Sequence, residues 1–169
     1  MRLSASLVIL TYNQERYVRD TLASALAQAC DPIEIVLSDD ASSDRTVEVA
    51  RSLASGYQGP HKVVIHRNER NLGLVGNLAA AAKIASGDWL VSSGGDDLSD
   101  PSRVARILEA ARKNSHLMAI GSRYRLIGEH GQALPESSSA RQWHAHMKSM
   151  QDWPPERMLR NASRGRPLF

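Results

Sequence analysis

Short apolar runs alternate with longer segments of helical periodicity over the first 120 residues. This alternation is typical of strand–helix–strand units that build a largely parallel sheet. The pattern predicts strands at residues 6–10, 33–38, 63–65, 89–92 and 118–120, and helices at residues 15–29, 44–53, 74–85 and 101–114. We therefore expect an α/β fold in which helices flank a mostly parallel sheet.

The periodic pattern ends near Pro135. Just before it, residues 124–127 and a turn at residues 128–131 suggest a hairpin or an extension of the sheet edge. Beyond it, apolar residues are too scattered to define a core helix. We therefore expect one globular domain over residues 1–133 and a separate segment over residues 134–169.

Two pairs of adjacent aspartates follow predicted strands. Asp39 and Asp40 come after the second strand, and Asp96 and Asp97 come after the fourth. In an open α/β sheet, the loops at the carboxyl ends of the strands meet around one crevice, so the two pairs are expected to converge. Paired carboxylates hold Mg²⁺ or Mn²⁺ while leaving positions for water and phosphates. The structural alternative is that Asp96 makes a turn and Asp97 is solvated.

Composition narrows the function classes. At 169 residues, 42% of them hydrophobic, the chain suffices for one well-buried domain. Only 5% of residues are aromatic, which argues against a stacking platform for single-stranded nucleic acid, and no nucleic-acid partner is expected. Cys30 is the single cysteine, so an internal disulfide is excluded.

Charge and hydropathy bear on location. The apolar run at residues 7–10 is too short for a signal peptide or a membrane span, which favours a cytoplasmic protein. Residues 141–169 carry six Lys and Arg against two Asp and Glu. This basic tail could touch anionic lipid at the inner face of the membrane, or it could be an ordinary solvated end.

Several short motifs occur in a characteristic order. They are Val8–Asn13, Ile35–Asp44, Asn68–Gly73 and Gly87–Trp89, followed by Gly95–Asp97. Together they resemble family 2 glycosyltransferases of the GT-A fold, over about the first two thirds of the chain. The resemblance implies a Rossmann-like, GT-A-like nucleotide-sugar-binding domain followed by an incomplete C-terminal acceptor lobe or a basic tail.

The resemblance also implies an activity. A sugar would pass with inversion from a nucleotide-diphosphate sugar, most often a UDP sugar, to a hydroxyl of a glycan or lipid-linked acceptor, as in cell-surface polysaccharide synthesis. A Mg²⁺ or Mn²⁺ cofactor would stabilise the charge that develops on the departing diphosphate.

Site residues follow from the matching motifs. Those implied to bind the nucleotide sugar are Thr11, Tyr12, Asn13, Asp39, Asp40, Arg70, Asn71 and Asp96. Asp40 is preferred over Asp39 as the acceptor of a base N–H, because Asp39 lies nearer the strand interior. Asp97, with Asp96, is implied to hold the metal.

Two departures from the family pattern affect the activity. Gly94 stands where a first carboxylate is common, and the chain lacks a recognisable context for the general base. The late candidates for that base are Glu129, Asp152 and Glu156, each of which could equally be a surface acid. A nucleotide-sugar-binding chain without turnover is therefore the alternative. A phosphoacceptor signalling domain is a weaker one, because it gives the Thr-Tyr-Asn strand end no role.

Overall fold

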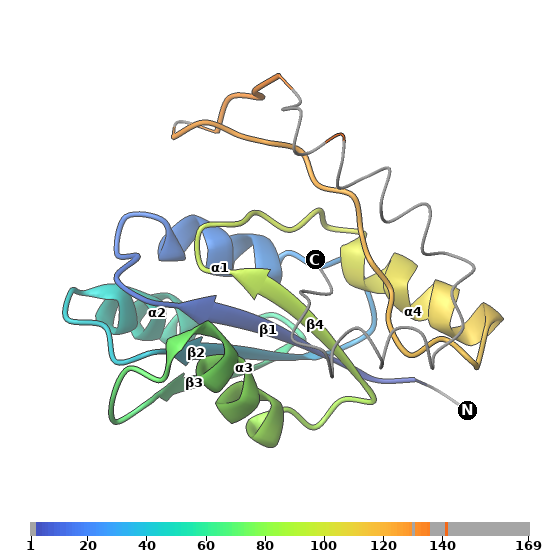
Figure 1. The fold of residues 1–169 in the computed structure, drawn as a ribbon, viewed down its shortest axis with the longest axis horizontal. Coiled ribbons are helices and arrows are strands. Elements are labelled where there is room, and N and C mark those ends of the chain that lie inside the picture. The colour runs from blue at the N-terminus through green and yellow to red at the C-terminus, as the bar shows by residue number, and fades with distance from the viewer. Residues whose placement is uncertain (1–2, 130, 136–140, 142–169) are drawn as a thin grey trace, which may run out of the picture. The chain divides into compact units, whose positions relative to one another are not determined.

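The computed structural model describes residues 3–129, 131–135 and 141. Its strands are β1 (Ala5–Thr11), β2 (Glu34–Asp39), β3 (Lys62–Arg67) and β4 (Trp89–Gly94), and its helices are α1 (Val18–Leu26), α2 (Thr46–Ser55), α3 (Gly73–Ile84) and α4 (Arg103–Lys113). Strands and helices alternate along the chain, as the sequence predicts (Figure 1).

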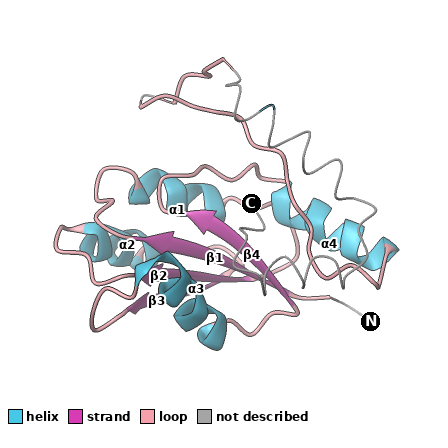
Figure 2. Ribbon diagram, in the orientation of Figure 1, coloured by secondary structure: helices cyan, strands magenta, loops and turns pink. Residues whose placement is uncertain are grey.

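The four strands form one parallel sheet in the order β3-β2-β1-β4 (Figure 2). Each strand connects to the next through a helix, as parallel neighbours require. In the pairing register, Thr11 lies opposite Asp39 and Leu10 lies opposite Gly94. The ends of β2 and β4 therefore flank the end of β1, and the predicted α/β class with a parallel sheet is confirmed.

Helices cover both faces of the sheet. On one face, Ala81 of α3 packs against Val8 and Val36. Side chains alternate between faces along a strand, so Leu7 and Ile9, both fully buried, point to the opposite face. There α1 packs against α2, and both contact β2. The continuous apolar centres of β1 and β2 are thus explained by burial from both sides.

The first helix is shorter than its apolar periodicity predicts. It begins at Val18 rather than residue 15, because Asn13 adopts a left-handed backbone with φ 51° and residues 14–17 form a turn. Gln14 O accepts hydrogen bonds from Tyr17 N (3.0 Å) and Val18 N (2.9 Å) as the helix starts.

The predicted fifth strand is wrong. Residues 118–120 have no regular structure, and Met118 is 66% exposed. Three apolar residues are too few to hold a strand without a packing surface. The predicted hairpin is reduced to a single antiparallel bridge between Ile127 and Ala133, closed by a turn in which Gly131 has φ 75°. Residues 1–115 form one compact unit, and the described residues from 116 onward belong to a second.

Candidate functional site

The two acidic loops meet at the carboxyl end of β1. Asp40 N donates a 2.9 Å hydrogen bond to Thr11 O. On the other side of β1, a Cβ built on Gly95 would lie 2.6 Å from Thr11 Cγ2. Both loops therefore contact the same residue, at the point where the strand order reverses between β1 and β4. Such switch points are where open α/β sheets bind their ligands.

Asp39 is occupied by the structure of its own loop. Its carboxylate is fully buried and accepts hydrogen bonds from Thr11 Oγ1 (3.1 Å), Ser42 N (2.9 Å) and Ser42 Oγ. Arg67 Nε lies 3.6 Å from Asp39 Oδ1, and Arg67 Nη2 donates to Ser42 O at 2.9 Å. These bonds close the loop over Ala41, whose φ of 61° is unusual for a residue with a side chain.

Asp40 organises the loop that precedes α3. Its Oδ1 accepts hydrogen bonds from Asn68 Nδ2 (2.9 Å) and from Leu72 N (2.8 Å), the residue at the start of that helix. A carboxylate at a helix N-terminus is favoured by the helix dipole. Asn68 Nδ2 also donates to Asn77 Oδ1, at 3.0 Å. Ser38 Oγ donates to the same Asn77 oxygen at 2.6 Å.

Asp96 and Asp97 converge over Gly94. A Cβ built on Gly94 would lie 3.0 Å from both Asp96 Oδ1 and Asp97 Oδ2, and Gly94 N donates to Asp97 Oδ2 at 3.0 Å. Both carboxylates are exposed. A small residue at position 94 thus lets two hard oxygen ligands approach one point.

This donor set fits a Mg²⁺ or Mn²⁺ ion that is completed by substrate. Mg²⁺ is usually held through one or two carboxylates plus water and substrate phosphates. Within the described residues, no group of three or more His, Cys, Asp or Glu side chains could hold a metal by itself. Asp96 and Asp97 would thus supply two of the ligands and leave the other positions open.

Arg103 lies beside the second acidic loop. Its Nη2 donates to Ser92 O at 2.7 Å and its Nη1 to Ser99 Oγ at 3.1 Å, which joins α4 to the end of β4. Burial lowers the pKa of the guanidinium, and the nearby Asp97 carboxylate acts in the opposite direction. Arginine remains charged in proteins, so Arg103 is a fixed cation next to Asp97.

The remaining predicted binding residues lie on the same edge. Tyr12 is half exposed, and Asn13 Oδ1 accepts from Ser43 N at 2.9 Å. Arg70 and Asn71 are exposed between Asn68 and Leu72, the two residues bonded to Asp40, and Asn71 Oδ1 accepts from Gly73 N at 2.9 Å.

The three candidate bases lie outside the unit that carries this site. Glu129 is exposed and belongs to the second unit, and Asp152 and Glu156 lie outside the described residues. Sequence reasoning missed the contribution of Arg67, because its partners Asp39 and Ser42 lie on another strand and its loop and leave no local pattern. It also missed Arg103, whose partners Ser92 and Ser99 precede it in the chain.

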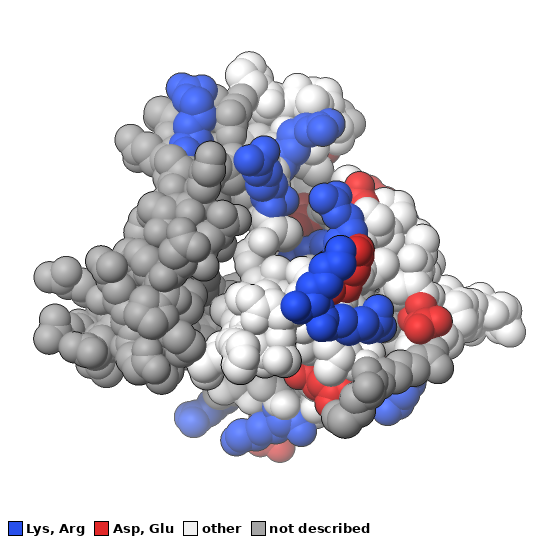
Figure 3. Space-filling model, turned by 90° about the vertical axis from the view of Figure 1, so that its right-hand side faces the viewer, with Lys and Arg blue, Asp and Glu red and all other residues white. Residues whose placement is uncertain are grey.

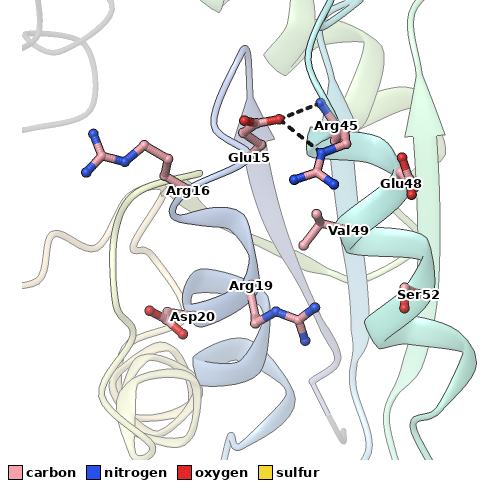
Figure 4. A pocket seen from close by; sticks show the side chains of 8 residues that line it. All are labelled: Glu15, Arg16, Arg19, Asp20, Arg45, Glu48, Val49 and Ser52. Carbon is pink, nitrogen blue, oxygen red and sulfur yellow. Dashed lines mark hydrogen bonds and ion pairs between the residues drawn. The ribbon is translucent and has the colours of Figure 1, made fainter.

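A charged cleft between α1 and α2 is separate from these loops. Its lining includes Arg16, Arg19, Asp20 and Glu48. Figure 4 shows Arg19 extending from α1 toward α2, with Arg45 Nε 3.6 Å from Glu15 Oε2. None of the predicted site residues lines it. In Figure 3 as well, basic side chains of the described residues lie among acidic ones. Mixed charge of this kind is ordinary for a solvated surface.

The family follows from comparison with known proteins. The sequence pattern described as "Glycosyl transferase family 2" matches residues 6–163. The chain belongs to glycosyl transferase family 2. Among family relatives, EpsE of Bacillus subtilis, which carries a glycosyltransferase name, is 31% identical over 75% of this chain and 45% of its own. A dolichol-phosphate mannosyltransferase of Pyrococcus furiosus is 38% identical over 72% of this chain and 34% of its own.

Solved structures support the GT-A fold. TarS 1-349 of S. aureus in complex with UDP-GlcNAc superposes with a TM-score of 0.58 at 24% identity, covering 66% of this chain and 32% of that one. The mannosyltransferase PcManGT of Pyrobaculum calidifontis, in complex with GDP-Man and Mn²⁺, gives 0.61 at 21% identity, covering 66% and 33%. This chain therefore matches less than half the length of these relatives. No helix among the described residues is long and apolar enough to cross a membrane.

Proposed function

We propose that residues 1–133 bind the donor of a metal-assisted, inverting glycosyltransferase that moves a sugar from a UDP sugar to an acceptor hydroxyl. The observation that carries the proposal is the contact of both acidic loops with Thr11. The loop of Asp39 and Asp40 then faces the nucleoside, and the loop of Asp96 and Asp97 faces the diphosphate. A single ligand spans both loops. The UDP-GlcNAc complex of TarS supports this choice of donor class.

Donor recognition is assigned to the first loop and the segment that Asp40 organises. Asp40 holds the main chain at Leu72, which fixes the loop carrying Arg70 and Asn71. The exposed guanidinium of Arg70 is suited to offset phosphate charge. Tyr12, half exposed, offers an aromatic face against which a base can pack.

The diphosphate is assigned to the second loop. Asp97 would ligate Mg²⁺ or Mn²⁺, and Asp96 would contact the metal or the hydroxyls of ribose and sugar. The cation, when bound, stabilises the negative charge that develops on the leaving diphosphate. Arg103 keeps a positive charge beside Asp97 and ties its loop to α4.

Transfer with inversion requires a base that deprotonates the acceptor hydroxyl. Glu129, Asp152 and Glu156 stay the candidates for this role. The acceptor is proposed to be a glycan or a lipid-linked sugar of a cell-surface polysaccharide. The basic residues of the segment 141–169 would bring the protein to the inner face of the membrane.

Thermal-shift measurements with nucleoside diphosphates and UDP sugars, with Mn²⁺ or with EDTA, test the binding step. We expect stabilisation by uridine nucleotides that increases with Mn²⁺. Asp97→Asn should remove the Mn²⁺-dependent part, whereas Asp20→Asn, an exposed acid of α1, should retain it. Equal shifts in wild type and Asp97→Asn would exclude Asp97 as the metal ligand.

Release of UDP from the bound UDP sugar, measured with and without candidate acceptors, separates the two functional alternatives. An active transferase releases UDP and loses turnover when its base is neutralised. A chain that binds the nucleotide sugar tightly with no release of UDP is a binding module.

A further inference from the structure

A buried side-chain oxygen beside the second acidic loop has no hydrogen-bond partner. It is Oε1 of Gln14, and it is the one such side-chain atom found among the residues that the structure describes. The main chain of Gln14 is well anchored, since its N donates to Thr46 Oγ1 at 2.7 Å and its O accepts from Val18 N at 2.9 Å. Leaving a buried acceptor unpaired is destabilising, so such groups are rare and call for an explanation.

The carboxamide of Gln14 occupies the space beside Gly95. A Cβ built on Gly95 would lie 1.8 Å from Gln14 Oε1 and 2.6 Å from Thr11 Cγ2, so a larger residue there would require both side chains to move. On another side, Thr21 Oγ1 donates to Gly95 O at 2.9 Å. Gly95 is thus held between β1, α1 and the carboxamide, directly before Asp96 and Asp97.

We propose that Gln14 is a donor-binding residue beside the second acidic loop, and that its Oε1 accepts a hydrogen bond from a hydroxyl of the nucleotide sugar. This inference rests on the proposed function. Ribose and sugar hydroxyls can each donate a hydrogen bond, and Gln14 Oε1 has no donor in the free protein. Gly95 packs against this oxygen, so a hydrogen bond from the donor requires Gly95 to shift. The main chain of Gln14 is anchored to Thr46, whereas its carboxamide packs against Gly95, so its side chain is assigned to the second loop.

Gln14→Met tests the proposal, because methionine keeps the length of the side chain and removes the acceptor. The free variant should be more stable than wild type, with a melting temperature higher by roughly 2–4 °C. Its affinity for UDP-GlcNAc with Mn²⁺ should fall about tenfold. UDP and 2′-deoxy-UDP identify the hydroxyl: an unchanged affinity for UDP assigns a sugar hydroxyl, and a tenfold loss with UDP that is absent with 2′-deoxy-UDP assigns the ribose.

Gln28→Met is the matched control. Gln28 is also buried, but its Oε1 accepts from Val104 N at 3.0 Å and its Nε2 donates to Asp100 O at 2.8 Å. Removing this partnered carboxamide should lower the melting temperature. Gln14→Ala, which empties the space beside Gly95, should weaken binding with Mn²⁺ at least as much as Gln14→Met.

The outcomes separate this inference from the proposed function. If wild type binds UDP with Mn²⁺ and Gln14→Met binds it equally well with every probe, Gln14 has no role in donor binding. Equal weakening with UDP-GlcNAc, UDP and 2′-deoxy-UDP would show a general structural role and overturn the assignment of Oε1 to a hydroxyl. If wild type binds no uridine nucleotide, the proposed function itself fails.

Discussion

The hydroxyl of Thr11 donates a 3.1 Å hydrogen bond to Asp39 Oδ2 where β1 and β2 end side by side. The same carboxylate accepts from Ser42 and pairs with Arg67. Asp39 therefore shapes the loop, while the adjacent Asp40 reaches across to the segment before α3. Two neighbouring residues of identical chemistry thus have different structural partners, and only the packing of the strands distinguishes them.

Replacing Asp39 should weaken the fold. In Asp39→Asn, one amide oxygen cannot replace two carboxylate oxygens that accept from Thr11 and Ser42 and face Arg67, so buried donors lose their partners. We expect the free energy of unfolding to fall by about 2 kcal/mol, measured by urea denaturation. Asp20→Asn, on the exposed face of α1, should stay within about 0.5 kcal/mol of wild type. Equal stability of the two variants would show that the Asp39 contacts contribute nothing.

Ala41 offers a test of backbone strain at the site. Its φ of 61° disfavours any residue with a Cβ, whereas glycine adopts it freely. Ala41→Gly should raise the free energy of unfolding by about 0.5–1 kcal/mol, after allowing for the greater flexibility of glycine in the unfolded chain. Ala27→Gly, at an ordinary φ of −88°, should lower it. A loss of stability in Ala41→Gly would contradict the strained conformation.

Glu34, at the opposite edge of the sheet, should make stability depend on pH. Burial raises the pKa of this carboxyl, but hydrogen bonds from Ser86, Lys62 and Ser6 outweigh it and hold the pKa at about 2, against an ordinary value of 4.5. Because the pKa is lowered in the folded state, the contribution is present above pH 4.5 and is lost as the pH falls toward 2. Lys62 is largely exposed, so solvent screening limits the contribution to at most about 2–3 kcal/mol.

Glu34→Gln measures this contribution. The difference in unfolding free energy between wild type and Glu34→Gln should be largest near neutral pH and should shrink below pH 4.5. Glu48→Gln, an exposed acid of α2, should show no such trend. A difference that is constant with pH would mean that Glu34 stabilises the fold through its shape alone.

The sequence predicted the sheet well where burial dominates. The run at residues 33–38 predicts a strand, and β2 is Glu34–Asp39, buried at every position. Because the strands are parallel, their carboxyl ends lie at the same edge of the sheet, and both aspartate pairs follow these ends. The predicted strand at residues 118–120 failed because an apolar triplet carries no information about whether a neighbouring strand exists.

Details of the site depend on contacts that no local pattern contains. The delayed start of α1 follows from the backbone of Asn13, which periodicity cannot show. The ion pair of Arg67 with Asp39 joins the ends of two strands 28 residues apart in the chain. The unpaired oxygen of Gln14 likewise appears only when Gly95 is packed against it.

Donor binding as proposed requires a single nucleotide that spans both acidic loops. Isothermal titration of UDP in the presence of Mn²⁺ into wild type, Asp40→Asn and Asp97→Asn tests it most directly. We predict one UDP per chain in wild type and, in each variant, an affinity lower by about tenfold, which is about 1.4 kcal/mol. Affinity that is unchanged in either variant, or two independent sites that each respond to one variant, would contradict it.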